Sequence, residues 1–184
     1  MKNWHKKNKV IAYITRNQGR ELLVFDHRDF VAAGTQVPGG TVESGEDLKL
    51  AMLREIKEES GLIFAQDQLA PLGQFEWKRF DRKEIHQRHV FWIDLKTSSP
   101  DRWTHIVQGT DEDQDLVFNY YWVNLDDVIN GKIKLAAEQG LFLQEIKRPS
   151  LIYTPFSRQV LKQAFLEFGV KSSKGVDHER PFEL

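Results

Sequence analysis

Cysteine is absent from the 184-residue sequence. Disulfide bonds, zinc–thiolate centres and thiol nucleophiles are therefore excluded. An excess of one charge is also lacking, because 26 lysines and arginines oppose 27 aspartates and glutamates, which leaves a formal net charge of −1. Bulk electrostatics therefore gives no general reason to expect binding to nucleic acids or membranes, and no specific nucleic-acid partner is expected.

Long apolar runs are missing as well. No stretch is long enough to span a bilayer, and the amino-terminal residues MKNWHKKNK lack the apolar core of a signal peptide. We therefore expect no membrane partner and a cytoplasmic location. The chain contains 40% hydrophobic and 29% charged residues, which is typical of a globular protein, and its length suits one domain.

The first forty residues predict a polar start followed by a hairpin. Residues 1–9 are polar and basic, which indicates a loose arm or a short edge segment. Two apolar runs, at 10–15 and 21–25, flank the polar residues 17–19 and predict a β-hairpin. Residues 36–40, QVPGG, predict a short extended segment that ends in a tight turn, where a ligand can approach the backbone closely.

The second half of the chain predicts strands first and helices later. Apolar runs and breaker residues give the following order: strand 72–80, turn 81–83, strand 85–95, a long polar connection over 97–115, strand 116–123, a short helix from 125, and helices over 136–147 and 156–168. We expect one mixed α/β domain over residues 1–170, with helices on both faces of the sheet, and a loose tail over 171–184.

Residues 40–62, GTVESGEDLKLAMLREIKEESGL, predict a helix with an acidic end. At spacings of three and four residues, Glu55, Glu58 and Glu59 share one helix face. Each like-charge neighbour of this kind costs a helix about 0.2–0.5 kcal/mol, so a cation is expected among the carboxylates. Hard divalent cations prefer oxygen donors, and Mg²⁺ typically uses one or two carboxylates together with substrate phosphates.

The ends and the other side of this helix carry signals too. Ser44 and Asp47 predict a capping box at its start, and Gly61 predicts its carboxyl-terminal cap. Three apolar residues at helical spacing predict a core-facing side away from the carboxylates: Leu50, Leu53 and Ile56.

The same stretch follows the pattern G-x5-E-x7-R-E-U-x-E-E-x-G-U, with U an aliphatic residue, from Gly40 to Leu62 without a departure. It resembles the Nudix box of the Nudix hydrolases, and the preceding residues Val37-Pro38-Gly39 are also usual in that family. Nine specified positions in a fixed register make the match specific. The resemblance implies an α/β/α sandwich with a mixed central sheet, over roughly residues 8–170.

The resemblance also implies roles for the box residues. Glu55 and Glu59 would be the primary Mg²⁺ ligands, and Glu58 would assist directly or through water. The Gly39 carbonyl would be a further ligand, and Mn²⁺ could substitute for Mg²⁺. Arg54 would orient the carboxylates by charge-assisted hydrogen bonds.

The implied reaction is hydrolysis of the phosphoanhydride bond in a nucleoside diphosphate linked to another group, foremost a nucleoside di- or triphosphate. Such a reaction needs a general base. In the family this is either a box glutamate or an acidic residue of a distant loop, which here is residues 111–115. Glu112 is the favoured candidate of this loop, and Asp113 and Asp115 remain alternatives.

Aromatic and basic side chains outside the box are candidates for binding the substrate. Trp77 and Trp103 stand in polar surroundings and could stack on a nucleobase. Arg79, in a basic hairpin, could hold a phosphate, and Arg28 could contact the substrate. The competing interpretation for each is a core position or an exposed, solvated side chain.

Several alternatives remain open within the family. Glu76 and Trp77 occupy the place where ADP-ribose hydrolases carry a proline, so that subgroup is not indicated. A dinucleoside polyphosphate or nucleotide-sugar hydrolase remains possible, as does a non-catalytic nucleotide- or RNA-binding Nudix domain. The related diphosphate isomerases are disfavoured because they use a catalytic cysteine. The small-molecule nucleotide would be bound by a monomer or a homodimer.

Overall fold

The structure is a computed structural model that describes residues 4–109 and 114–146. The predicted helix over 156–168, the tail over 171–184, the proposed domain end at 170 and the candidates Glu112 and Asp113 lie outside the described residues. Within the described part, no helix is long and apolar enough to cross a membrane.

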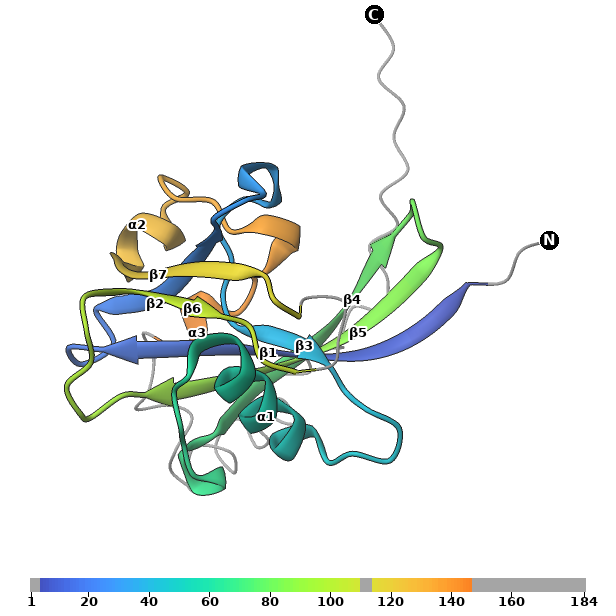
Figure 1. Ribbon diagram of the computed structural model, residues 1–184, viewed down its shortest axis with the longest axis horizontal. Helices are drawn as coiled ribbons and strands as arrows, with labels where there is room; N and C mark the ends of the chain where they lie inside the picture. Colours follow the sequence, from blue (N-terminus) through green and yellow to red (C-terminus); the bar gives the residue numbers. More distant parts are fainter. Residues whose placement is uncertain (1–3, 110–113, 147–184) are drawn as a thin grey trace, which may run out of the picture. The chain divides into compact units, whose positions relative to one another are not determined.

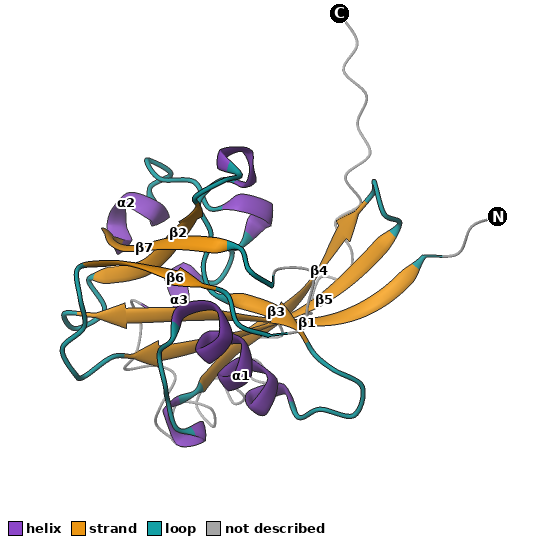
Figure 2. Cartoon of the chain, in the orientation of Figure 1, coloured by secondary structure: helices purple, strands orange, loops and turns teal. Residues whose placement is uncertain are grey.

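The described chain forms a seven-stranded sheet in the order β4-β5-β1-β2-β7-β6, with β3 paired to β1 (Figure 1). The strands are β1 (His5–Arg16), β2 (Glu21–His27), β3 (Gly39–Thr41), β4 (Ala70–Arg79), β5 (Glu84–Asp94), β6 (Arg102–Ile106) and β7 (Val117–Asn124). The helices are α1 (Leu48–Ser60), α2 (Leu125–Ile129) and α3 (Leu143–Ile146), with short 3₁₀ turns at 31–33, 66–68 and 136–138 (Figure 2).

Strand β1 occupies the middle of the sheet. It pairs in parallel with β5 along most of its length and antiparallel with β2 and β3, so the sheet is mixed, as predicted. Of the two predictions for residues 1–9, the loose arm was wrong for the described part, because β1 begins at His5, whereas residues 5–8 pair along one side only, with β5. The lysine-rich composition was misleading: the backbone of this segment forms ladder hydrogen bonds while its charged side chains stay near the surface.

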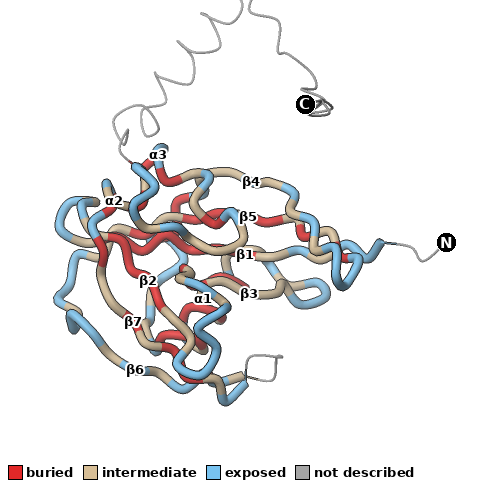
Figure 3. Tube along the Cα trace, turned by 90° about the horizontal axis from the view of Figure 1, so that it is seen from above, coloured by how far each residue is buried: buried red, intermediate tan, exposed pale blue. Residues whose placement is uncertain are grey.

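Helices pack on both faces of the sheet, which confirms the predicted α/β/α sandwich. Alternate residues of β1 point to opposite faces. Val10, Ala12 and Ile14 pack with α1, whereas Ile11 and Tyr13 pack with α2 and α3. Burial is concentrated in the central strands, where β1, β2 and β5 are largely buried (Figure 3).

Helix α1 begins later than the sequence predicted. Its N-cap is Asp47, whose carboxylate accepts hydrogen bonds from the backbone N–H groups of Lys49 and Leu50, and Ser44 lies before the helix. The structure therefore contradicts the predicted capping box. The carboxyl-terminal cap is Gly61, as predicted, with a left-handed φ of 76°.

The faces of α1 also differ from the prediction. Leu50 is 52% exposed, whereas Glu55 and Glu59 are each only 4% exposed and lie on the buried side with Ile56. The three-residue spacing drifts around a helix of 3.6 residues per turn, so Leu50 and Ile56 do not share a face. The carboxylates consequently face the sheet and β3, which brings them to the candidate site.

Two segments were assigned incorrectly from the sequence. Residues 97–115 were expected to be an irregular connection, but they contain β6, which pairs antiparallel with β7. Residues 136–146 form a 3₁₀ turn and the four-residue helix α3 instead of one longer helix. In β6 the exposed and partly buried residues alternate, so the strand carries no continuous apolar run that would have indicated it.

Candidate functional site

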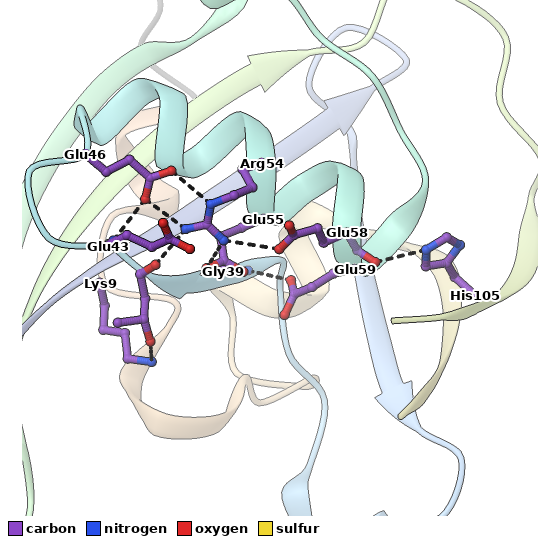
Figure 4. Close-up of polar contacts among 10 residues, drawn as sticks. Lys9, Gly39, Glu43, Glu46, Arg54, Glu55, Glu58, Glu59 and His105 are labelled. Carbon is purple, nitrogen blue, oxygen red and sulfur yellow. Dashed lines mark hydrogen bonds and ion pairs between the residues drawn. The ribbon is translucent and has the colours of Figure 1, made fainter. Parts of the chain in front are cut away.

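The buried carboxylates of α1 lie against β3, with Glu59 beside Gly39 (Figure 4) and Glu55 beside Gly40. The Gly39 N–H donates to Glu59 Oε2 over 2.9 Å. A Cβ atom on Gly40 would lie about 2.0 Å from the Glu55 carboxyl carbon, so only glycine fits at this position without displacing the carboxylate. The tight Pro-Gly-Gly segment and the acidic helix end, predicted separately, therefore form one site.

Arg54 connects the remaining glutamates. Its Nε and Nη2 donate to the two carboxylate oxygens of Glu46, each over 2.9 Å, and its Nη1 donates over 3.1 Å to both Glu55 and Glu58 (Figure 4). Nη2 also donates to the backbone carbonyl of Thr41 in β3. The hydrogen bonds with Arg54 lower the pKa of Glu46, and the hydrogen bonds with Glu46 raise the pKa of Arg54. This fork-shaped binding orients the carboxylates and ties α1 to β3.

The segment after β6 closes the other side of the glutamate cluster. The Gln108 N–H donates to the Glu58 carbonyl over 2.9 Å, and His105 Nε2 lies 3.0 Å from the same oxygen. A Cβ atom on Gly109 would approach the Glu58 carboxylate to 3.0 Å, so the chain passes close by. This contact places Gln108 and Gly109 beside Glu58.

The donor set suits a hard divalent cation. Carboxylates of three glutamates and the backbone of β3 offer only oxygen ligands, the type that Mg²⁺ and Ca²⁺ prefer. Within residues 4–109 and 114–146, no three acidic or histidine side chains are arranged to hold an ion together. The residues therefore fit an ion that takes one or two carboxylates and completes its shell with substrate oxygens and water.

The carboxylates line a cavity of about 320 Å³ that has basic residues as well. Glu55, Glu58 and Glu59 contribute from α1, together with the β3 glycines. The cationic lining residues come from β1, β4 and the β4–β5 turn: Lys7, Lys9, Arg79 and Arg82. A divalent cation and a phosphate chain bound to it would both meet groups of opposite charge here.

Sequence reasoning missed Lys7 and Lys9 as site residues because their segment was taken for a loose arm. The alternation Lys7, Lys9, Ile11 places the three side chains on one face of a strand. That period-two pattern, continued into the apolar run, could have indicated that the strand starts early and that both lysines point to the same side.

A second groove adjoins the first and shares the β3 glycines, Lys9 and Arg79 with it. Trp77 lines this groove, with the guanidinium of Arg88 4.2 Å from the centre of a Trp77 ring. Arg88 is 6% exposed and donates to the carbonyl of Ala137, and burial lowers its pKa to about 10. Of the predicted substrate residues, Arg79 thus lines the carboxylate cavity and Trp77 lines the adjoining groove.

The other two predicted substrate residues lie elsewhere. Trp103 stacks on Tyr120 with ring centres 4.9 Å apart, and its Nε1 donates to the carbonyl of Ser60 at the end of α1. Arg28 is exposed and pairs with Asp29. Neither residue lines the two cavities, so their predicted contacts with substrate gain no support from the geometry.

Tyr120 of β7 interacts electrostatically with Glu59 of the glutamate cluster. Its side chain is buried, and its hydroxyl has no hydrogen-bond partner among the described residues. Burial, reinforced by the negative charge of Glu59, raises the pKa of Tyr120 well above the ordinary value. The hydroxyl beside the cluster is therefore neutral at physiological pH.

Known structures share this architecture. The MutT protein from Methanosarcina mazei Go1 superposes with a TM-score of 0.58 at 19% identity, covering 82% of this chain and 99% of that chain. A NUDIX hydrolase from Nitrosomonas europaea gives the same TM-score at 18% identity, with 82% of this chain and 94% of that chain covered. At these identities the likeness establishes the fold.

Sequence comparison gives one curated relative in more detail. The oxidized purine nucleoside triphosphate hydrolase of Danio rerio is 34% identical over 82 residues, which are 45% of this chain and 51% of the relative. The chain thus spans about half the length of this relative. The family model of the NUDIX domain matches residues 5–146, which include every described strand and helix. The chain therefore belongs to the NUDIX domain family.

Proposed function

We propose that the protein is a Mg²⁺-dependent hydrolase that cleaves the phosphoanhydride bond of a nucleoside triphosphate or of a related nucleoside diphosphate derivative. The single observation that carries this proposal is that Glu55, Glu58 and Glu59 line one cavity together with a set of lysines and arginines. Cation-binding and anion-binding groups in the same cavity suit a metal-bound diphosphate better than either ligand alone.

The residues that line the cavity have different roles in the proposed reaction. A bound Mg²⁺ supplies charge neutralisation at the diphosphate and lowers the pKa of a water ligand. Glu55 and Glu59, held by Arg54 and the Gly39 N–H, present carboxylate oxygens toward the cavity. Lys9, which lines the same cavity, would orient the phosphate oxygens of the diphosphate. Fixed placement of the reacting groups contributes much of the catalysis in phosphoryl transfer.

The proton of the attacking water needs an acceptor. Glu58 is the most exposed of the three cluster glutamates, with 26% of its side chain accessible, compared with 6% for Glu55. It therefore has access to the cavity and lies close to the backbone at Gly109. Glu58 and the loop residue Glu112 are the two candidates for the general base, and Asp113 and Asp115 are the remaining alternatives.

The base of the nucleotide would lie in the groove beside Trp77. This groove continues from the carboxylate cavity, and the planar groups of Trp77 and Arg88 offer a stacking surface. The relative from Danio rerio acts on oxidized purine nucleoside triphosphates, which supports a purine nucleoside triphosphate as the first substrate to test. The groove also contains Gln36 and Gln139, which could hydrogen-bond to the edge of a base.

The decisive experiment is a substrate panel assayed with Mg²⁺ and scored by the identity of the products. It contains purine and pyrimidine nucleoside tri- and diphosphates, oxidized purine nucleotides, dinucleoside polyphosphates and nucleotide sugars. We expect nucleoside monophosphate as one product, with the release abolished by chelation of divalent ions. Intact anhydride bonds across the whole panel, with binding retained, would replace the hydrolase proposal with that of a nucleotide-binding domain.

A further inference from the structure

Three cations of the cavity lie toward the tip of a projecting arm. The arm consists of the β4–β5 hairpin and the start of β1, which extend together from the body of the described chain (Figure 1). Lys7 on β1 and Arg79 at the end of β4 line the cavity from this arm, and Arg82 does so from the turn. None of these positions belongs to the glutamate box.

The strand register places the arm cations on one face. Lys7 is paired with His86 of β5, which in turn is paired with Trp77 of β4. Arg79 is the next residue after Trp77 on the same face, about 7 Å further toward the turn at the usual rise of a strand. The groove with Trp77 thus continues outward to Arg79, past the carboxylates of α1.

The formal charge of the cavity becomes positive when a divalent cation binds. Lys7, Lys9, Arg79 and Arg82 are opposed by four lining glutamates: Glu55, Glu58, Glu59 and Glu84. Each bound divalent ion adds two positive charges, so the loaded cavity becomes cationic. If a diphosphate were held at the carboxylates and Lys9, Lys7 and Arg79 would still face a further anionic group.

Lys7 and Arg79 keep N–H donors for a further anionic group. Lys7 forms an ion pair of 2.8 Å with Glu84, and Glu84 also lies 2.8 Å from His86 Nε2. These contacts hold the ammonium group of Lys7 in place. An ammonium has three N–H donors and a guanidinium has five. Lys7 and Arg79 can therefore each bind a phosphate oxygen while Lys7 stays on Glu84 and Arg79 stays on Asp81.

From this geometry we propose that Lys7 and Arg79 form a subsite for the terminal phosphate of a triphosphate chain, in a cavity that Arg82 also lines. The arm then distinguishes triphosphates from diphosphates and from nucleotide sugars, whose outer group is neutral. This inference rests on the proposed function and adds to it the residues that read the length of the phosphate chain.

Binding of inorganic phosphate chains tests the subsite without a nucleobase or turnover. Isothermal titration calorimetry in Mg²⁺ compares tripolyphosphate with pyrophosphate. We expect the wild-type protein to bind tripolyphosphate more tightly, and Arg79→Gln to reduce this advantage about tenfold, as loss of a charge-assisted hydrogen bond predicts. Lys7→Gln serves as the second variant and should act in the same direction.

Matched controls come from the opposite face of the same strands. Lys6 and Lys78 are exposed and both pair with Ile85, so Lys6→Gln and Lys78→Gln remove the same charge from the arm without touching the cavity. Both controls should keep the preference for tripolyphosphate. An equal loss in controls and test variants would show that only the bulk charge of the arm matters and would overturn the subsite.

Kinetics separates this inference from the proposed function. If the protein hydrolyses nucleotides, Arg79→Gln should lower the ratio of kcat/KM for a nucleoside triphosphate to that for its diphosphate. An active enzyme that shows no such preference, and no change in Arg79→Gln, refutes the subsite alone. An inactive wild type that binds tripolyphosphate through Arg79 refutes hydrolysis and retains the subsite.

Discussion

At the scale of single residues, the two glycines of β3 have different neighbours and therefore different tasks. A Cβ on Gly39 would lie 2.4 Å from the backbone carbonyl oxygen of Val10, whereas the three atoms nearest to a Cβ on Gly40 all belong to the Glu55 carboxylate. Neither glycine has a positive φ, so close approach and not backbone conformation is the constraint. Gly39 lets β3 pack on β1, and Gly40 gives the carboxylate its position.

Alanine substitutions should separate these two tasks. Gly40→Ala should leave the melting temperature nearly unchanged, because the end of a flexible side chain can move, yet reduce hydrolysis more than tenfold by displacing Glu55. Gly39→Ala should lower the free energy of unfolding by more than 1 kcal/mol, because a strand backbone must shift. Thermal unfolding and the rate of nucleotide hydrolysis check both. Equal destabilisation by the two substitutions would contradict the assignment.

Glu59 allows a substitution that changes charge and little else. In Glu59→Gln, the amide oxygen can still accept the Gly39 N–H, so the fold should be kept. Loss of the negative charge should weaken binding of Mg²⁺ and lower turnover by orders of magnitude. The measurements are Mg²⁺ titration by calorimetry and kcat with the best substrate of the panel. Glu43→Gln, at a neighbouring exposed carboxylate, is the control, and near-normal turnover in Glu59→Gln would remove the metal-ligand proposal.

At the scale of elements, β6 holds the carboxyl end of α1. A helix leaves its last carbonyl groups without partners inside the helix. Here the Ser60 carbonyl accepts from Trp103 Nε1, and the Glu58 carbonyl accepts from the Gln108 N–H and faces His105 Nε2. The strand that the sequence did not reveal therefore positions the end of the acidic helix.

Trp103→Phe should destabilise the protein through this contact. The phenyl ring can keep the stack on Tyr120, but the hydrogen bond to Ser60 is lost, which costs about 1 kcal/mol of the free energy of unfolding. Urea unfolding measures the loss. Trp122→Phe is the matched control, because its indole donates to Pro100 at an exposed site and should cost less. A higher KM in Trp103→Phe with unchanged stability would instead support the predicted contact with substrate.

At the scale of the whole described domain, a buried charge network ties the base of the arm to the central strand. Glu84 on β5 pairs with Lys7 on β1 and bonds His86, and it is only 9% exposed. The hydrogen bonds from Lys7 and His86 hold the pKa of Glu84 down at about 2, below its ordinary value of 4.5. The parallel pairing of β1 with β5 is thus reinforced where the arm leaves the sheet.

This network predicts an acid-sensitive part of the stability. Because the folded pKa of Glu84 is depressed, its contribution is complete above about pH 4.5 and disappears as the pH falls toward 2. The free energy of unfolding of Glu84→Gln should therefore lie below that of the wild type at pH 7, and the difference should shrink between pH 5 and pH 3. Urea unfolding at several pH values tests this, with Glu76→Gln on the exposed side of β4 as control. A difference that is independent of pH would exclude the network as its source.

The local features of this protein were legible in the sequence because neighbouring residues produce them. The hairpin around residues 17–19, the Gly61 cap and the acidic register of α1 depend on short-range geometry, and the structure contains all three. The full Nudix register likewise predicted the α/β/α sandwich and its mixed sheet. Helix faces were less certain, because a spacing of three residues drifts against the helical period, and Leu50 came out exposed.

What only the tertiary structure decided is how distant segments meet. Lys7 and Lys9 join the glutamates because β1 lies between β5 and β3, and the strand order of a sheet is set by packing of the whole core. Trp103 lies outside the cavity because it belongs to β6, where it stacks on Tyr120 of the neighbouring strand β7. The sequence of β6 has no continuous apolar run, so the strand becomes evident only through its pairing with β7. The sequence by itself determined the family and identified Glu55, Glu58 and Glu59, because the family pattern and these three glutamates lie within 23 contiguous residues. The lysines and arginines of the cavity come from strands and a turn far apart in the chain, and only strand pairing brings them into the same cavity as the carboxylates.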